Sequence, residues 1–155
     1  MKKLAKSDST QAAVDAMVNA AKPPHKVPKH VMLRPEDKPF WDGILLARAR
    51  DEWTEADLVV AAQLARCQQD IELESKQLYA ETSVVTNARG TQIMNPRITV
   101  LEQLARREMA MMRTLRMGGQ VAGNRGKDMD NKRKLERASR QQREDLQDED
   151  DLIAA

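Results

Sequence analysis

The sequence has few aromatic residues, few glycines and a single cysteine. Phe, Trp and Tyr make up 3% of its 155 residues, whereas charged residues make up 32%. This composition is typical of an elongated, mostly helical protein with flexible ends, and it does not favour a compact enzyme. The lone Cys67 excludes a disulfide bond within the chain and favours a reducing, intracellular compartment.

Long apolar stretches are missing as well. No run approaches the roughly 20 apolar residues that span a bilayer, and no apolar signal-peptide region follows Met1. The sequence therefore predicts neither a membrane span nor a secretion signal.

Residues that would support catalysis or bind a metal do not cluster in the sequence. His25 and His30 lie in a proline-rich stretch, without the spacing that places two ligands on one helical face. None of the six glycines precedes a Lys-Ser or Lys-Thr pair, so no Walker-type phosphate loop is present. Cys67 falls on an apolar helical stripe, as a core thiol does. We expect no enzymatic activity, no metal and no cofactor.

Charge is strongly segregated along the chain, although the net charge is only +2. Counting Lys and Arg against Asp and Glu, the successive blocks carry +5, −6, +4, +5 and −6 over residues 1–35, 36–82, 83–117, 118–143 and 144–155. Basic blocks beside an acidic one indicate an anionic partner for part of the surface. A solvated charged surface would produce the same pattern in any one block.

Residues 1–35 form a predicted N-terminal arm. The stretch 7–21 has helical periodicity and a capping residue at Ser7 or Ser9. Four prolines between residues 23 and 35 then predict an extended linker, because proline fixes φ and disfavours helix in the residue before it.

The next segment predicts a helix–turn–helix corner. A helix begins around Pro39, carries apolar residues at helical spacing, and should end near Asp51. Thr54 and Asp57 have the spacing of a capping box, which starts a second helix that extends to about Glu81. A short helix, a tight turn and a capped long helix make a helix–turn–helix unit in the loose sense.

The second helix carries a narrow apolar seam. Apolar residues recur at heptad spacing from Val60 to Leu78, with one polar interruption at Glu74. The stretch "SVVTNARGTQIM" that follows consists of two β-prone segments around Asn-Ala-Arg-Gly. It predicts a short β-hairpin with a positive φ at Gly90.

A third helix is framed by clear start and stop signals. Asn95 is a good capping residue, Pro96 occupies the first helical position, and Gly118-Gly119 should end the helix. The hairpin should fold this helix back along the second one. The fold class is therefore mainly α, with long antiparallel helices joined by a short β-hairpin.

Residues 36–118 form the predicted helical core and oligomerisation domain. A core of roughly 80 residues usually needs support beyond its own apolar residues, and a long thin seam is best buried against a second copy. We therefore predict a homo-oligomer. The residues expected in its core and contacts are Trp41, Trp53, Leu64, Ile71, Leu101 and Met112.

Residues 119–155 form a charged, largely disordered C-terminal tail, with a helix from 131 to 143 as an open alternative.

The order of these elements resembles the small terminase subunits of tailed bacteriophages. The resemblance depends on "SDSTQAAVDAMVNAA", "PFWDGIL", "WTEADLVVAAQLARCQQDI", "NPRITVLEQLARREMAMMRTL" and "DEDDLIA". It implies a non-catalytic protein of the host bacterial cytoplasm that forms a ring and binds the packaging site on double-stranded viral DNA. It also implies a partner, the large terminase subunit, which carries the ATPase and nuclease that the small subunit regulates. One departure is the acidic helix–turn–helix corner, since a recognition helix for the major groove is normally basic.

DNA binding is therefore assigned to other basic residues. A row of guanidinium groups along the third helix can contact phosphates, although the same arginines could pair with the acidic second helix. The candidate DNA-binding residues are Lys2, Lys3, Lys6, Lys22, Lys26, Lys29, Arg106, Arg113 and Arg116. The candidate residues for the large subunit lie in the acidic tail and are Asp148, Asp150, Asp151, Leu152 and Ile153.

Two other functions are compatible with the sequence. A dimeric helix–turn–helix DNA-binding regulator would need a basic recognition helix, which the acidic second helix does not supply. A coiled-coil scaffolding or adaptor protein would share the thin core and the charged ends, but it would not bind duplex DNA.

Overall fold

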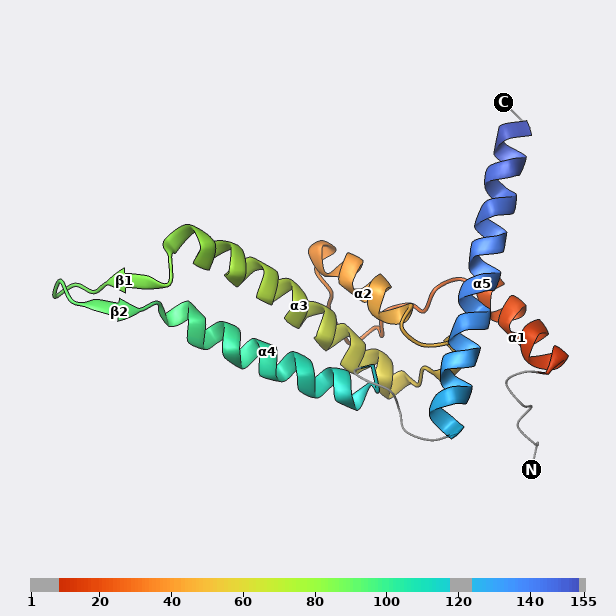
Figure 1. Ribbon diagram of the computed structural model, residues 1–155, viewed down its shortest axis with the longest axis horizontal. Helices are drawn as coiled ribbons and strands as arrows, with labels where there is room; N and C mark the ends of the chain where they lie inside the picture. The colour runs from red at the N-terminus through yellow and green to blue at the C-terminus, as the bar shows by residue number, and fades with distance from the viewer. Residues whose placement is uncertain (1–8, 118–123, 154–155) are drawn as a thin grey trace. The chain divides into compact units, whose positions relative to one another are not determined.

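The computed structural model describes residues 9–117 and 124–153 (Figure 1). The chain divides into two compact units. Unit 1 is made of the described parts of Met1–Lys26, Leu45–Trp53 and Gly119–Ala155, and unit 2 of those of Val27–Ile44 and Thr54–Gly118. Within the described residues, no helix is both long enough and apolar enough to cross a membrane.

The long helix of unit 2, α3 (Glu55–Glu81), begins at the predicted capping box. The Thr54 hydroxyl accepts a hydrogen bond from the Asp57 N–H at 3.2 Å, and the Asp57 carboxylate accepts one from the Thr54 N–H at 3.2 Å. These two bonds satisfy donors that a helix start otherwise leaves open. The 27 residues of α3 give a helix about 40 Å long.

The hairpin after α3 also forms as predicted. Strand β1 (Val84–Thr86) pairs antiparallel with β2 (Gln92–Met94). Gly90 has a φ of +78°, and the Asn87 side chain accepts the N–H groups of Arg89 and Thr91 at 2.9 and 3.0 Å. The turn therefore depends on a positive φ and on a side chain that satisfies its backbone.

Helix α4 (Pro96–Thr114) starts where the sequence predicted. The buried Asn95 caps it by accepting from the Arg97 N–H at 3.0 Å, and its amide nitrogen donates to the Thr82 carbonyl at 3.0 Å. The helix ends earlier than predicted, because Arg116 takes a positive φ of 56° and the Met117 N–H bonds the Met112 carbonyl at 2.9 Å. Gly118 and Gly119, the predicted stop, lie outside the described residues.

Helices α3 and α4 lie side by side and antiparallel, as predicted (Figure 1). The Cys67 thiol donates to the Leu104 carbonyl at 3.4 Å, and the Gln68 amide donates to Glu108 at 2.9 Å. Burial also raises the pKa of the Cys67 thiol, which therefore stays protonated as a core residue.

The core of unit 2 is concentrated in the first half of α3. Its buried members there are Leu58, Ala61, Ala62, Leu64, Ala65 and Cys67. Trp41, from the short helix α2 (Lys38–Leu45), is also buried. Among the other predicted core residues of this unit, Ile71, Leu101 and Met112 are only half-buried. The apolar seam is therefore real, but its burial fades with distance from the start of α3.

Unit 1 is built around α1 (Thr10–Ala21), which packs against α5 (Asn124–Ile153). Ser9 caps α1 by accepting the Ala12 N–H at 3.2 Å. The sequence predicted that α2 would reach Asp51, whereas it ends at Leu45 and a 3₁₀ turn, Arg50–Glu52, follows. Trp53 is buried in this unit.

The sequence predicted a largely disordered segment over 119–155, whereas the structure forms one continuous helix from Asn124 to Ile153. Two kinds of contact account for it. Within the helix, Glu136 pairs with Arg140, and Gln141 donates to Asp145 at 3.0 Å. From outside, the nearly fully buried Glu136 accepts the Arg50 N–H at 2.9 Å. A contact across 86 residues of sequence is invisible to local periodicity.

Candidate nucleic-acid interface

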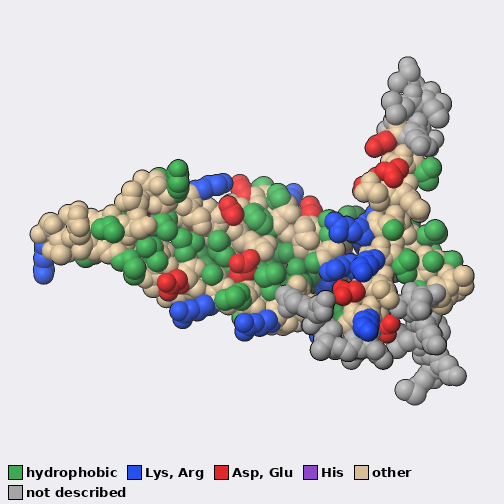
Figure 2. Space-filling view, in the orientation of Figure 1, with side chains coloured by type: hydrophobic (Ala, Val, Ile, Leu, Met, Phe, Trp, Pro, Cys, Tyr) green, Lys and Arg blue, Asp and Glu red, His purple; other side chains and the backbone are tan. Residues whose placement is uncertain are grey.

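The predicted arginine row lies at the C-terminal half of α4. Arg106 and Arg113 are separated by seven residues, or two turns, so their side chains share one face of the helix. Both are exposed, as is Arg116 just beyond the helix end. Blue side chains lie along the outer edge of α4 in Figure 2. The structure therefore brings these three predicted residues to one stretch of unit 2.

The row is only weakly neutralised by the residues around it. Arg106, whose side chain is 79% exposed, pairs at 3.8 Å with Glu102 on its own helix. Arg113 and Arg116 have no ion pair with any described residue. An exposed pair at this distance contributes little attraction in water, so the three guanidinium groups remain available to an external anion.

Other arginines of the same unit are neutralised by the acidic helix. Arg97, on the first turn of α4, bonds Glu74 at 2.6 Å and Glu81 at 2.8 Å. The hydrogen bonds from Arg97, and then from Asn95, lower the pKa of the Glu81 carboxyl. The alternative interpretation paired the arginines of the row with α3, but among the described residues it is Arg97, outside the row, that forms these pairs.

Arg34, from the segment before α2, is held in the same way by acidic residues. Its guanidinium bonds Asp37 at 2.8 Å and Asp70 at 2.7 Å. Burial opposes ionisation of Asp37, but the hydrogen bonds from Arg34 outweigh it and hold the pKa of Asp37 below its ordinary value. These contacts fix the segment around residues 34–37 on α3, and they assign Arg34 a structural role.

The lysines of the N-terminal arm are partly described. Lys2, Lys3 and Lys6 lie outside the described residues. Lys22 and Lys26 are exposed in unit 1, where Lys22 donates to the Asn19 side chain at 2.9 Å, and Lys29 is exposed in unit 2. No described carboxylate forms an ion pair with any of these three lysines.

Sequence reasoning did not single out the basic side chains of α5. Several are engaged within unit 1: Lys132 pairs with Asp51 at 3.1 Å, and Arg143 donates to the Ala20 carbonyl at 3.3 Å. Lys127, Lys134 and Arg137 are instead exposed on one helical face, without an ion pair to a described residue. The sequence shows that residues 118–143 are basic, but it does not show which of these side chains share a face until the helix is known.

The acidic residues predicted to bind a partner lie at the end of α5. Asp148 is exposed. Asp150, Asp151, Leu152 and Ile153 belong to the helix, but their side chains lie outside what the structure describes.

A metal site does not emerge from the described part of the chain. There, no three His, Cys, Asp or Glu side chains lie close enough together to hold an ion. The ring of His25, one of the two histidines, lies 3.1 Å from the Arg50 carbonyl and so has a structural contact.

Comparison with known proteins gives a consistent result. All 155 residues match the model of the Hendrixvirinae small terminase family. The chain is also 31% identical over 150 residues to a protein of Enterobacteria phage HK97 named "Terminase, small subunit". That alignment covers 97% of this chain and 93% of the relative.

Proposed function

The chain belongs to the Hendrixvirinae small terminase family of viral DNA-packaging subunits, and from this premise we propose how it acts. It is a non-catalytic subunit that forms a ring in the host bacterial cytoplasm. The ring binds the packaging site on phage DNA, and it recruits and regulates the large terminase subunit, which carries the ATPase and the nuclease.

The exposed arginine row supports the DNA-binding part of this proposal. Arg106, Arg113 and Arg116 present guanidinium groups that the described residues neutralise only weakly, through one exposed pair between Arg106 and Glu102, whereas Arg34 and Arg97 each form two ion pairs. Duplex DNA carries one negative charge per about 1.7 Å of its axis, and basic side chains release its counterions. Repetition of the row around a ring multiplies a weak contact into a strong one. The lysines of the N-terminal arm contribute further positive charge to each subunit.

Unburied apolar residues support the ring. Several large apolar side chains are exposed in the hairpin and in the halves of α3 and α4 next to it. They are Leu73, Tyr79, Val84, Ile93, Met94 and Val100. All six belong to the parts of α3 and α4 nearest the hairpin or to the hairpin itself, and apolar surface of this kind is typical of an interface. Neighbouring copies in a ring would cover it and complete the seam that one chain leaves half-buried.

Charge reversal within the row tests DNA binding. The double variant Arg113→Glu and Arg116→Glu should lower affinity for duplex DNA at least tenfold at low salt, and it should flatten the dependence of affinity on salt concentration. Titration of labelled duplex at two salt concentrations measures both quantities. The matched control is Lys76→Glu with Arg89→Glu, which makes the same charge change at exposed positions of α3 and the hairpin. Unchanged affinity and salt slope in the first variant would make the row structural.

The acidic end of α5 supports recruitment of the large subunit. Residues 144–155 contain six acidic and no basic residues, and Leu152-Ile153 comes directly after the last acidic residue. A chain lacking residues 145–155 should form rings and bind DNA, yet fail to stimulate the large subunit in a packaging reaction. Normal packaging by this truncated chain would refute the assignment.

A further inference from the structure

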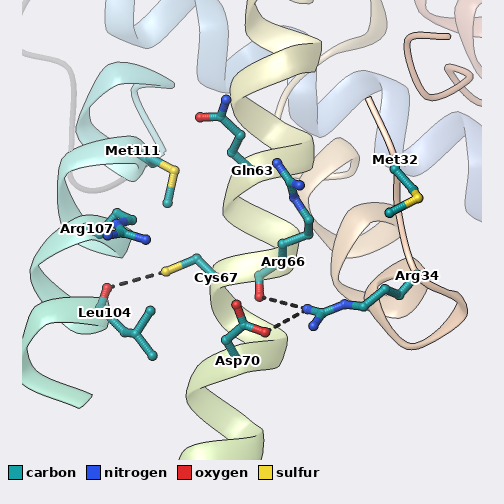
Figure 3. A pocket seen from close by; sticks show the side chains of 9 residues that line it. All are labelled: Met32, Arg34, Gln63, Arg66, Cys67, Asp70, Leu104, Arg107 and Met111. Atoms are coloured by element: carbon teal, nitrogen blue, oxygen red, sulfur yellow. Dashed lines mark hydrogen bonds and ion pairs between the residues drawn. The ribbon is translucent and has the colours of Figure 1, made fainter. Parts of the chain in front are cut away.

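Unit 2 contains a groove that the proposed DNA contacts do not use. It has a volume of about 600 Å³ and lies between the segment around Met32 and Arg34, helix α3 and helix α4 (Figure 3). Its apolar lining comes from Met32, Leu104 and Met111, and its basic lining from Arg34, Arg66 and Arg107. The groove therefore combines guanidinium groups with flexible apolar side chains.

The charge of the groove is incompletely balanced. Arg34 is neutralised by Asp37 and Asp70, the latter being the acidic residue of the lining. Arg66 and Arg107, which come from α3 and α4, form no ion pair with a described residue. The two structural arginines of this unit, Arg34 and Arg97, each have carboxylates within 2.8 Å. Two guanidinium groups facing one groove without such partners indicate a carboxylate supplied from outside.

The chain itself contains a segment of matching chemistry. In unit 1, Arg143 of α5 contacts α1 through the Ala20 carbonyl. Beyond it, Glu144 to Asp148 are all exposed, and Leu146 is 62% exposed. The sequence continues with three more acidic residues and then Leu152-Ile153. This end of α5 is thus acidic, partly apolar and uncovered over its described residues.

The methionines that line the groove favour a peptide over DNA as its occupant. A phosphate backbone would satisfy Arg66 and Arg107 but would leave the exposed Met32 without an apolar partner. An acidic helix with apolar residues on one face can bind both the arginines and the methionines, because arginines bind carboxylates and methionines adapt to apolar side chains. We propose that the groove binds the acidic end of α5 from a second copy of the chain. The inference rests on the proposed function in one respect: the groove would hold the segment that the large subunit takes, so the two would compete for it.

Disulfide trapping between two full-length variants tests the contact. Both carry Cys67→Ala, one adds Met32→Cys and the other Leu146→Cys, and tags of different length distinguish them. Mild oxidation of the mixture should give a cross-linked species of mixed size, because Leu146 would lie among Met32, Leu104 and Met111. The control replaces Leu146→Cys with Met17→Cys, which is 57% exposed on α1 of the same unit. Equal cross-linking by the control, or no mixed-size species at all, would overturn the proposal.

Charge reversal then tests the chemistry of the groove. Arg66→Glu with Arg107→Glu should lower the cross-linked fraction about tenfold, since two ion pairs become two repulsions. Reversal of Glu144→Arg and Asp145→Arg in the other partner should restore it, which excludes misfolding as the cause. Arg106→Glu with Arg113→Glu should leave cross-linking unchanged. Undiminished cross-linking in the groove variant, together with weaker DNA binding, would make the groove a phosphate site and refute the inference.

The same samples separate this inference from the proposed function. Light scattering and DNA titration report on the ring and on DNA binding in every variant. Loss of the cross-link with an intact ring and normal DNA affinity supports the groove contact. A small particle that does not bind DNA, even without groove substitutions, counts against the proposed function instead.

Discussion

The two ends of the α3–α4 pair differ in how completely the chain buries its own apolar residues. At the start of α3, six residues from Leu58 to Cys67 are buried, and Leu64 is fully inaccessible. Toward the hairpin, Leu73 is 45% exposed and Tyr79 is 92% exposed. The heptad seam itself continues toward the hairpin through Ile71 and Leu78, which are only half-buried, whereas Leu73 and Tyr79 lie beside it. One end therefore folds as an ordinary core, while the other end leaves apolar side chains exposed in the described part of the chain, where we propose that a neighbouring copy packs.

The arginines of α4 show the same division on a smaller scale. Arg97, near the hairpin, is bonded to Glu74 and Glu81 of α3. Arg106 and Arg113, in the other half of α4, are exposed and form no ion pair with a described residue of α3. Within the described residues, acidic side chains of α3 therefore bind α4 near the hairpin, whereas the arginines of α4 nearer the start of α3 have no acidic partner on α3.

The largest expected effect on stability comes from replacing a buried leucine of α3 by alanine, and an exposed leucine of the same helix provides the comparison. Leu64→Ala should lower the free energy of unfolding by about 3 kcal/mol, because it leaves a cavity in a packed site. Leu73→Ala should change it by less than about 0.5 kcal/mol for the chain itself, but it should lower the mean particle mass. Urea unfolding at one fixed protein concentration and light scattering measure the two effects. A similar loss of stability in both variants would erase the difference between the halves.

Much of this architecture follows from signals that act over a few residues. The capping box of Thr54 and Asp57, the cap and proline that start α4, and the positive φ of Gly90 are local chemistry, so each was predictable. The helix of α5 was not, because it depends on packing against α1 and on the contact from Glu136 to the Arg50 backbone.

The roles of individual arginines were less predictable than the helices that carry them. Arg97 and Arg106 lie on the same helix. The carboxylates that neutralise Arg97 lie 16 and 23 residues away along the chain. Only the register between α3 and α4 decides which arginine meets an acid and which remains exposed, and that register is a property of the packed pair.

A smaller effect is expected when the bonded arginine is removed. Arg97→Ala should lower stability at neutral pH and make it less sensitive to acid. The pKa of Glu81 is depressed below the ordinary value of 4.5 by Arg97, so its contribution is present above that pH and is lost as the pH falls through the folded value. Thermal unfolding between pH 3 and pH 7 measures the difference. Coincident curves for the two proteins would show that the ion pairs contribute nothing to the stability of the fold.

The smallest expected effect on stability comes from the exposed arginine two turns from the end of α4. Arg106→Ala should leave the free energy of unfolding within about 0.5 kcal/mol, because a loose i, i+4 pair with Glu102 is all that is lost. The same change should weaken binding to duplex DNA and reduce its salt slope by about one. Denaturant unfolding and DNA titration on one preparation test both expectations. A destabilised protein with unaltered DNA affinity would place Arg106 with Arg97, among the residues that hold the helices together.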